Sequence, residues 1–99
     1  MAANSLDIHP SALVELKSAV SWYQRHSETT ADNFVAEIDH AIDLILVSPQ
    51  RWPVGDFATR KFVLRRFPYA VIYYEKESTV RILAIAHGHR RPGYWKARL

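Results

Sequence analysis

The sequence predicts an α+β fold in which a short strand and two helices precede a three-stranded antiparallel meander. Apolar residues recur with a helical period in the first half of the chain, and the period changes to two after residue 59. The links between the last three predicted strands are only a few residues long, so neighbouring strands must run antiparallel. A chain of 99 residues is expected to form one domain, over 1–99.

The chain is expected to begin with a strand followed at once by a helix. Leu6-Asp7-Ile8-His9 alternates apolar and polar residues, and Pro10 suits the first turn of a helix, where its missing N–H costs nothing. The apolar stripe of this helix, which should span about residues 10–26, consists of Leu13, Leu16, Val20 and Tyr23.

A second helix is expected over about residues 30–47. Thr29 and Asp32 resemble a capping box at its start, and Ser48-Pro49 marks its end. Its apolar stripe consists of Phe34, Ile38, Ala41, Ile42, Ile45 and Leu46. Because the link between the helices is short, the two should form an antiparallel helical hairpin.

Three strands are predicted over 60–65, 70–75 and 79–87, with turns at Phe67-Pro68 and at 76–78. The third strand places four apolar residues in succession, at 82–85, so apolar groups point to both faces of the sheet. Two helices can cover only one of these faces. The other should be covered by the C-terminal tail or held for a partner.

The composition excludes several classes of site. The absence of cysteine removes disulfides, thiol nucleophiles and Cys-type zinc sites, and favours a cytoplasmic location. No apolar run reaches the roughly 18 residues of a membrane span, and residues 1–10 lack the pattern of a signal peptide. No glycine-rich phosphate loop or serine elbow is present, so no cofactor is expected.

Charge divides the chain into an acidic and a basic half. Residues 1–50 contain two basic and seven acidic residues, a net charge of −5. Residues 51–99 contain eleven basic and three acidic residues, a net charge of +8. The basic half suits an anionic partner, either a nucleic acid or an acidic protein segment, although a merely solvating surface is the alternative.

Three runs of sequence, taken with the order of the elements, resemble the RelE/ParE superfamily of toxins from type II toxin–antitoxin pairs. These runs are FPYAVIYY at 67–74, HGHRRPGYW at 87–95, and the Ser48-Pro49 loop with its aromatic residue. The ParE-like members, of the plasmid-stabilisation type, look most similar. The resemblance implies a β-α-α-β-β-β toxin that a small antitoxin neutralises by wrapping around the helical hairpin and the sheet.

The superfamily implies two different activities. RelE-like members cleave mRNA on the ribosome, whereas ParE-like members poison DNA gyrase. The RelE-like pattern has lysines on the first meander strand and an arginine at the start of the second, where this chain has Lys61 but then Val63 and Ala70. Two of the cations that would stabilise a phosphorane-like transition state are therefore missing, which favours a gyrase inhibitor over an enzyme.

Histidines keep the endoribonuclease alternative open. Histidine is the side chain best suited to acid–base catalysis near neutral pH, so His87 and His89 are candidates, although structural roles at a strand end are more common. The candidate catalytic residues of a ribonuclease would be Lys61, His87, His89, Arg90 and Tyr94. A metal site is not predicted, because His87-x-His89 lacks a third ligand at suitable spacing.

The sequence also predicts one surface that binds the target and another that binds the antitoxin. The predicted target-binding residues lie in the basic C-terminal tail and are Arg90, Arg91, Tyr94, Trp95, Lys96 and Arg98. Trp22 and Tyr23 on the first helix are the predicted antitoxin-binding residues. A third hypothesis is a non-toxic relic that retains only antitoxin binding.

Overall fold

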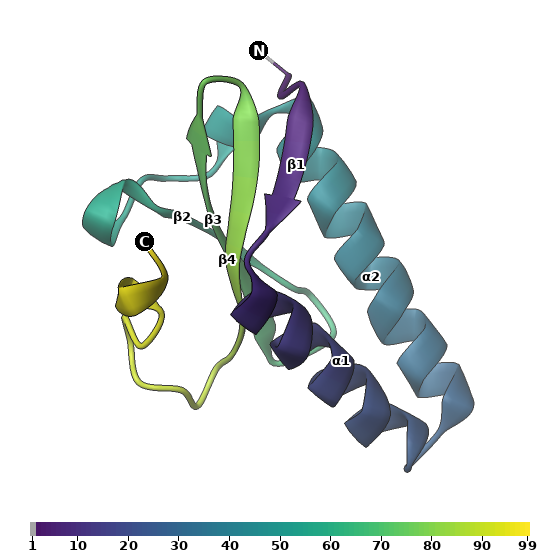
Figure 1. Cartoon of the computed structure of the whole chain (residues 1–99). Helices are drawn as coiled ribbons and strands as arrows, with labels where there is room; N and C mark the ends of the chain where they lie inside the picture. The colour runs from purple at the N-terminus through teal and green to yellow at the C-terminus, as the bar shows by residue number, and fades with distance from the viewer. Residues whose placement is uncertain (1) are drawn as a thin grey trace.

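The computed structural model describes residues 2–99 and has the predicted order of elements (Figure 1). Three short 3-10 turns, η1 (Pro49–Arg51), η2 (Asp56–Ala58) and η3 (Lys96–Arg98), lie outside the main elements. The main elements are β1 (Ser5–Ile8), α1 (Pro10–Gln24), α2 (Glu28–Val47), β2 (Arg60–Val63), β3 (Tyr69–Lys76) and β4 (Thr79–His87). The predicted α+β class, helical hairpin and meander are confirmed.

The four strands form one mixed sheet in the order β1-β4-β3-β2. β2, β3 and β4 pair antiparallel as neighbours, and β1 pairs parallel with β4, from Ser5 opposite Thr79 to Ile8 opposite Ile82. In Figure 1 both helices lie on one side of the sheet, whereas the C-terminal segment lies on the other. We call the side away from the helices the outer face and residues 88–99 the tail.

The start of α1 follows the prediction, and the start of α2 does not. Pro10 occupies the first turn of α1, where the His9 ring accepts a hydrogen bond from the backbone N–H of Ser11 at 3.0 Å. The predicted capping box of Thr29 and Asp32 is wrong. The N-cap is Ser27, whose extended backbone lets its hydroxyl accept from the Thr30 N–H at 3.2 Å, so Thr29 already lies in the first turn.

β2 is shorter than its alternating pattern suggests. It ends at Val63, two residues before the predicted end. The backbone N–H groups of Arg65 and Arg66 both donate to Glu37 on α2, at 2.6 and 3.2 Å. Because a helix carboxylate takes these donors, the chain leaves the sheet here and turns back into β3.

A register shift in β4 explains the four successive apolar residues. Ile72 lies opposite Ala84 and Tyr73 lies opposite Ile82, so Leu83 is an extra residue in β4. This shift places Ile82 and Ile85 in the core under the helices, and it places Leu83 and Ala84 in a second cluster on the outer face. The sheet therefore carries apolar side chains on both faces, as predicted.

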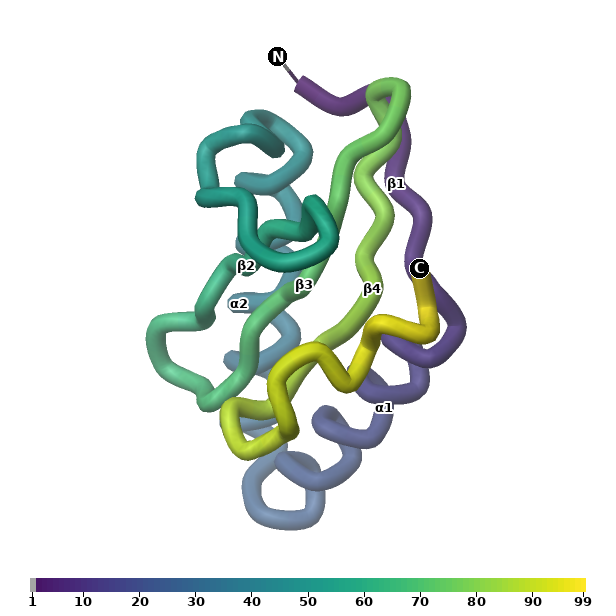
Figure 2. The backbone as a smooth tube through the Cα atoms, turned by 90° about the vertical axis from the view of Figure 1, so that its left-hand side faces the viewer, coloured from purple at the N-terminus to yellow at the C-terminus, as the bar shows by residue number. Residues whose placement is uncertain are grey.

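Two apolar clusters result. The larger one lies between the sheet and the helices, and includes the fully buried Phe34, Ile38, Ile45, Val71, Tyr73 and Val80. The second lies on the outer face and consists of Ala70, Ile72, Leu83, Ala84 and Trp95. Figure 2 shows the tail and the loop before β2 crossing in front of the sheet on this face. Within residues 2–99, no helix is long and apolar enough to cross a membrane.

Candidate functional site

The tail is held to α1 by the carboxylate of Glu15. Arg98 donates to both of its oxygens, Nη1 to Oε1 at 2.8 Å and Nη2 to Oε2 at 3.0 Å, and the Tyr94 hydroxyl donates to Oε2 at 2.7 Å. Both ion-pair side chains are only 16% exposed. Such a two-pronged pair is shorter and stronger than a single surface contact.

The side chains of Glu15 and Arg98 also form hydrogen bonds with the part of the β4 edge that β1 does not cover. β1 ends at Ile8, opposite Ile82. Beyond that point, the backbone N–H of Ile85 donates to Glu15 Oε1 at 3.0 Å, and the carbonyl of Leu83 accepts from Arg98 Nη1 at 2.9 Å. The tail is therefore part of the sheet's hydrogen bonding.

The shared contacts displace the pKa values of this cluster. Burial alone would raise the pKa of Glu15, but hydrogen bonds from Arg98, Tyr94 and the Ile85 N–H outweigh it, so the pKa lies below its ordinary value of 4.5. Burial raises the pKa of Tyr94, and its hydrogen bond to the Glu15 carboxylate raises it further. The Tyr94 hydroxyl therefore stays protonated and donates a hydrogen bond to Glu15. Its raised pKa makes it a poor general acid for catalysis.

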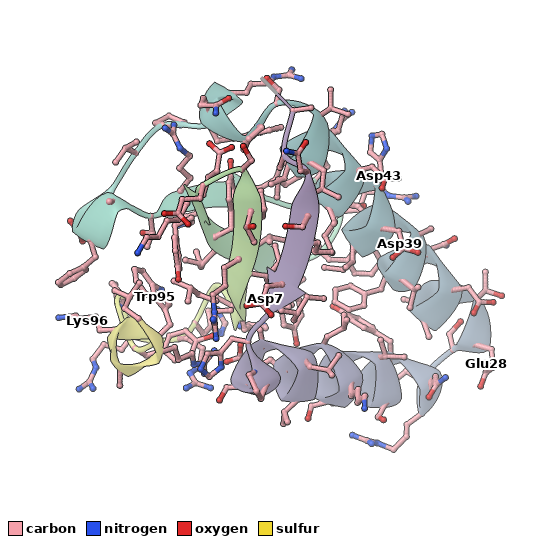
Figure 3. The ribbon with its side chains drawn as sticks, turned by 45° about the horizontal axis from the view of Figure 1, so that its top comes forward. Asp7, Glu28, Asp39, Asp43, Trp95 and Lys96 are labelled. Atoms are coloured by element: carbon pink, nitrogen blue, oxygen red, sulfur yellow. The ribbon has the colours of Figure 1, made fainter. Side chains whose placement is uncertain are left out.

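Trp95 fixes the middle of the tail. It is only 7% exposed and packs in the outer-face cluster against Ala70, Ile72, Leu83 and Ala84. Figure 3 shows Trp95 and the neighbouring Lys96 pointing in different directions from the tail. The Lys96 amine lies 5.2 Å from the centre of the Phe57 ring and the residue is exposed.

A concave basin of about 580 Å³ lies on the outer face between the tail and the loop at 53–59, which we call the rim loop. The strands contribute Lys61, Val63, Ala70, Ile72 and Ala86 to its lining. The tail contributes Arg90, Arg91, Tyr94 and Trp95, among others. Its size falls within the range of about 300–1,000 Å³ that is typical of ligand sites.

The basin is positively charged at its rim. Lys61, Arg90 and Arg91 are exposed, and none has an ion-pair partner among residues 2–99. Arg90 instead lies over the Tyr94 ring, with its guanidinium carbon 4.0 Å from the ring centre. Asp56 is the only acidic residue in the lining. The basin therefore attracts anions.

The rim loop has a strained backbone. Phe57 and Ala58 both have positive φ angles, of 59° and 58°, in the left-handed region that favours glycine. Phe57 is 56% exposed and its ring lies edge-on to Trp95, with centroids 6.3 Å apart. Arg60 anchors the loop, because its Nη1 donates to the carbonyls of Gln50 and Trp52. Its guanidinium is therefore less available to a ligand than the amine of Lys61.

A second groove, of about 630 Å³, follows α1. Val14, Ser18 and Trp22, at i, i+4 and i+8, line it from the helix, and Tyr69, His87 and Arg90 line it from the sheet and tail. We call it the α1 groove. Trp22 is 50% exposed and stacks on His26 at 4.1 Å, whereas Tyr23 packs inward against Phe34 and Phe67.

The predicted target-binding residues separate into two groups. Tyr94, Trp95 and Arg98 are held by contacts within the chain, as described above. Arg90, Arg91 and Lys96 are exposed. The structure therefore brings all six together in one tail but leaves only the second group open to a partner.

The candidate catalytic residues lie near the basin without forming a proton-transfer pair. His87 Nδ1 accepts a hydrogen bond from the His89 backbone N–H at 3.0 Å, and its ring packs edge-on to Tyr69 and His89. Val63 and Ala70 are directly paired across β2 and β3 on the outer face. Within residues 2–99, no group of three or more potential metal ligands is positioned to hold an ion.

Sequence reasoning missed Glu15. An acidic residue on the polar face of an amphipathic helix has the pattern of a solvated side chain, and its partners are 70 to 83 residues away. No local signal distinguishes this carboxylate from the exposed Asp39 and Asp43, which Figure 3 shows along α2.

Comparisons with known proteins agree with this geometry. A protein-family model described as ParE toxin of type II toxin-antitoxin system, parDE, matches residues 6–92. No curated protein matches the chain. Among solved structures, the chromosomal ParDE TA system from P. aeruginosa matches with a TM-score of 0.73 and 20% sequence identity, over 84% of this chain and 94% of that chain. At this identity, the structural match supports the fold alone.

Proposed function

Because the chain belongs to the ParE toxin family of type II toxin–antitoxin systems, we propose that it inhibits growth by binding DNA gyrase in its complex with DNA, and that a cognate antitoxin neutralises it. The gyrase target follows from the resemblance to ParE-like toxins. Binding, not bond cleavage, is the proposed mode of action.

The cross-strand pair of Val63 and Ala70 is the observation that favours gyrase binding over mRNA cleavage, the two activities of the superfamily. These residues occupy the positions where the RelE-like pattern requires cations, and they lie side by side on the outer face. Lys61 is the only lysine in the basin lining. A surface with this composition can hold an anionic partner, but it lacks the charge that would stabilise a phosphorane-like transition state.

The exposed tail cations are the proposed target-binding residues. Arg90, Arg91 and Lys96 are exposed. Tyr94, Trp95 and Arg98 position them, because these three anchor the tail to α1 and to the sheet.

The α1 groove is the proposed antitoxin site. Trp22 supplies an exposed aromatic side chain of the kind that often dominates an interface. The groove and the basin share Pro68, Tyr69, His87, Arg90 and Tyr94 in their linings. An antitoxin that fills the groove and reaches Arg90 would therefore cover part of the surface proposed for the target, which is a direct route to neutralisation.

Two assays on the purified full chain test the proposal. Supercoiling by gyrase should be inhibited, and mRNA on programmed ribosomes should remain intact. Replacing Arg90 and Arg91 together with alanine should weaken inhibition, whereas replacing Lys17 and Arg25, which are exposed on and after α1, removes the same charge and should not. Message cleavage that disappears in His87→Ala or His89→Ala would instead establish the ribonuclease. Inactivity in both assays together with tight antitoxin binding would indicate a relic.

A further inference from the structure

A third concavity, of about 780 Å³, lies between α2 and the segments on either side of β2, and we call it the α2 groove. It shares no lining residue with the basin or with the α1 groove. Its lining consists of Ala36, Glu37, His40 and Leu44 on α2, Arg51 and Trp52 at η1, Phe62 on β2, and Arg65 and Arg66 after β2. Because Phe62 pairs with the core residue Val71, the groove lies on the helix side of the sheet.

The apolar part of the α2 groove is mainly aromatic. Trp52 and Phe62 are each partly buried, and their ring centroids lie 4.8 Å apart. Ala36 and Leu44 add apolar side chains from α2. An aromatic surface that is still partly open suits the flat face of a nucleobase, because stacking on such rings tolerates any base.

Arginines stand beside these rings. Arg51 and Arg65 are exposed, and neither has an ion-pair partner among residues 2–99. The guanidinium carbon of Arg51 lies 5.2 Å from the centre of the Trp52 ring, close enough for a cation–π contact. The planar fork of an arginine side chain matches the geometry of a phosphate group, so the α2 groove offers two phosphate donors next to an aromatic surface.

Glu37 is the only acid in this lining, and its carboxylate is already occupied. It accepts from the backbone N–H groups of Arg65 and Arg66, at 2.6 and 3.2 Å, and forms an ion pair with Arg66 Nε at 3.1 Å. These bonds fix the backbone that carries Arg65, which reduces the ordering that a ligand would have to impose. Glu37 therefore shapes the groove and leaves the charges of Arg51 and Arg65 for a ligand.

We propose that the α2 groove binds a nucleoside polyphosphate, with the base against Trp52 and Phe62 and the phosphates on Arg51 and Arg65. The volume falls within the range of about 300–1,000 Å³ that is typical of small-molecule sites. The inference goes beyond the proposed function and does not depend on it, because none of the proposed target-binding residues lines this groove.

The charges around the groove favour a short ligand over a polymer. α2 also carries the exposed Asp39 and Asp43, which lie outside the lining (Figure 3). These acids oppose a polyanion that continues along the helix, whereas a di- or triphosphate keeps its negative charges near the arginines. One flat ring joined to several closely spaced negative charges is the chemistry of a nucleotide.

The test is isothermal titration calorimetry of the purified full chain with ATP, inorganic triphosphate and adenosine. ATP should bind with a dissociation constant of about 10–100 μM at about 50 mM salt. Triphosphate lacks the base and should bind about tenfold more weakly, and adenosine, which lacks the charges, should bind more weakly than ATP by at least as much. Arg51→Ala and Arg65→Ala should each weaken ATP binding by about fivefold to tenfold.

The indole N–H signals of the tryptophans locate the bound ligand in a ¹H–¹⁵N NMR spectrum. The chain has three tryptophans, Trp22, Trp52 and Trp95, and only Trp52 lines the α2 groove. ATP should shift the Trp52 signal and leave the other two in place. Trp52→Leu, which assigns this signal, should weaken ATP binding by about tenfold because stacking is lost. Urea unfolding shows whether each variant is folded, and the two arginine variants test the site independently of Trp52.

Matched variants separate the groove from general electrostatic attraction. Lys17→Ala on α1 and Lys61→Ala in the basin each remove one exposed positive charge from outside the lining. Both should leave the affinity for ATP within about twofold of wild type.

Five results would overturn the inference. The first two are the absence of saturable ATP binding up to about 1 mM and triphosphate binding as tight as that of ATP. The next two are an equal loss of affinity in Lys61→Ala and Arg65→Ala, and a shift of the Trp22 or Trp95 signal in place of Trp52. The last is displacement of ATP by an equal concentration of an acidic peptide of the same charge, which would identify a protein segment as the occupant.

Discussion

Glu15 on α1 and Arg98 in the tail form a two-pronged ion pair, with N–O distances of 2.8 and 3.0 Å, although 83 residues separate them. Glu15→Gln keeps the size of the side chain but removes its charge. It should lower the free energy of unfolding by about 1.5–3 kcal/mol, because hydrogen bonds to charged groups are lost and Arg98 keeps an unpaired, half-buried charge. Urea denaturation at pH 7 measures the change.

The control for this variant is Asp39→Asn. Asp39 is an exposed acid on α2 with no ion-pair partner among residues 2–99. Its replacement should change the free energy of unfolding by less than about 0.5 kcal/mol. Equal effects of the two substitutions would mean that the ion pair contributes nothing to holding the tail.

The stability of the protein should fall in acid. The pKa values of Glu15 and Glu37 are both lower in the folded protein than the ordinary value of 4.5, because in each case hydrogen bonds to the carboxylate outweigh the opposing effect of burial. Their contribution is therefore complete above the ordinary pKa and is lost as the pH falls through the lower folded values. Urea unfolding between about pH 6 and about pH 3 should show this loss, with a shallower slope for Glu15→Gln than for wild type. Parallel curves would contradict it.

Substitutions of the buried Trp95 and the exposed Trp22 compare the contributions of a core and a surface tryptophan to the free energy of unfolding. Trp95→Ala leaves a cavity under the tail and should cost about 3–5 kcal/mol, whereas Trp95→Phe, which fills part of it, should cost less. Trp22 is 50% exposed, so Trp22→Ala should cost less than about 1 kcal/mol. Thermal and urea unfolding measure both, and a Trp95→Ala protein as stable as Trp22→Ala would show that the outer-face cluster is not part of the core.

The fold was predictable because its signals are local. The change of period after residue 59 separates helices from strands, and Pro10 and Ser48-Pro49 mark the ends of helices in the way that their backbone chemistry requires. β2 was overestimated because Arg65 continues its alternation, yet the Arg65 N–H binds Glu37 on a distant helix. Tertiary contacts of this kind leave no mark on the local pattern.

The candidate site was less predictable, for a related reason. The sequence identifies the tail as basic, but composition does not show which cations are already neutralised within the chain. Arg98 is neutralised by Glu15, whereas Arg91 has no ion-pair partner among residues 2–99. The register shift at Leu83 likewise decides which apolar side chains reach the outer face. The local sequence contains no turn residue that would predict this shift.

The turn between β3 and β4 offers a stabilising substitution. Lys76 pairs with Thr79, so the loop has two residues, Glu77 and Ser78, with φ angles of 53° and 64°. Glycine adopts this conformation at less cost than serine, so Ser78→Gly should raise the free energy of unfolding by about 0.5–1 kcal/mol. Ser78→Ala is the control, because it retains the side-chain penalty. A loss of stability in Ser78→Gly, measured by thermal unfolding, would contradict the strain that the positive φ implies.

Arg91 and Arg98 separate target binding from tail anchoring. Arg91 is exposed and unpaired within residues 2–99, so Arg91→Ala should leave stability within about 0.5 kcal/mol of wild type while raising the concentration needed for half-inhibition of gyrase. Arg98 is bound to Glu15 and to the Leu83 carbonyl, so Arg98→Ala should reduce stability and inhibition together. Urea unfolding and the supercoiling assay, applied to both variants and to Lys17→Ala as the charge-matched control, measure the two effects separately. The opposite result would be an Arg98→Ala protein that is fully stable but does not inhibit gyrase, together with an Arg91→Ala protein that is stable and inhibits normally. In that case Arg98, and not Arg91, would be the residue that contacts the target.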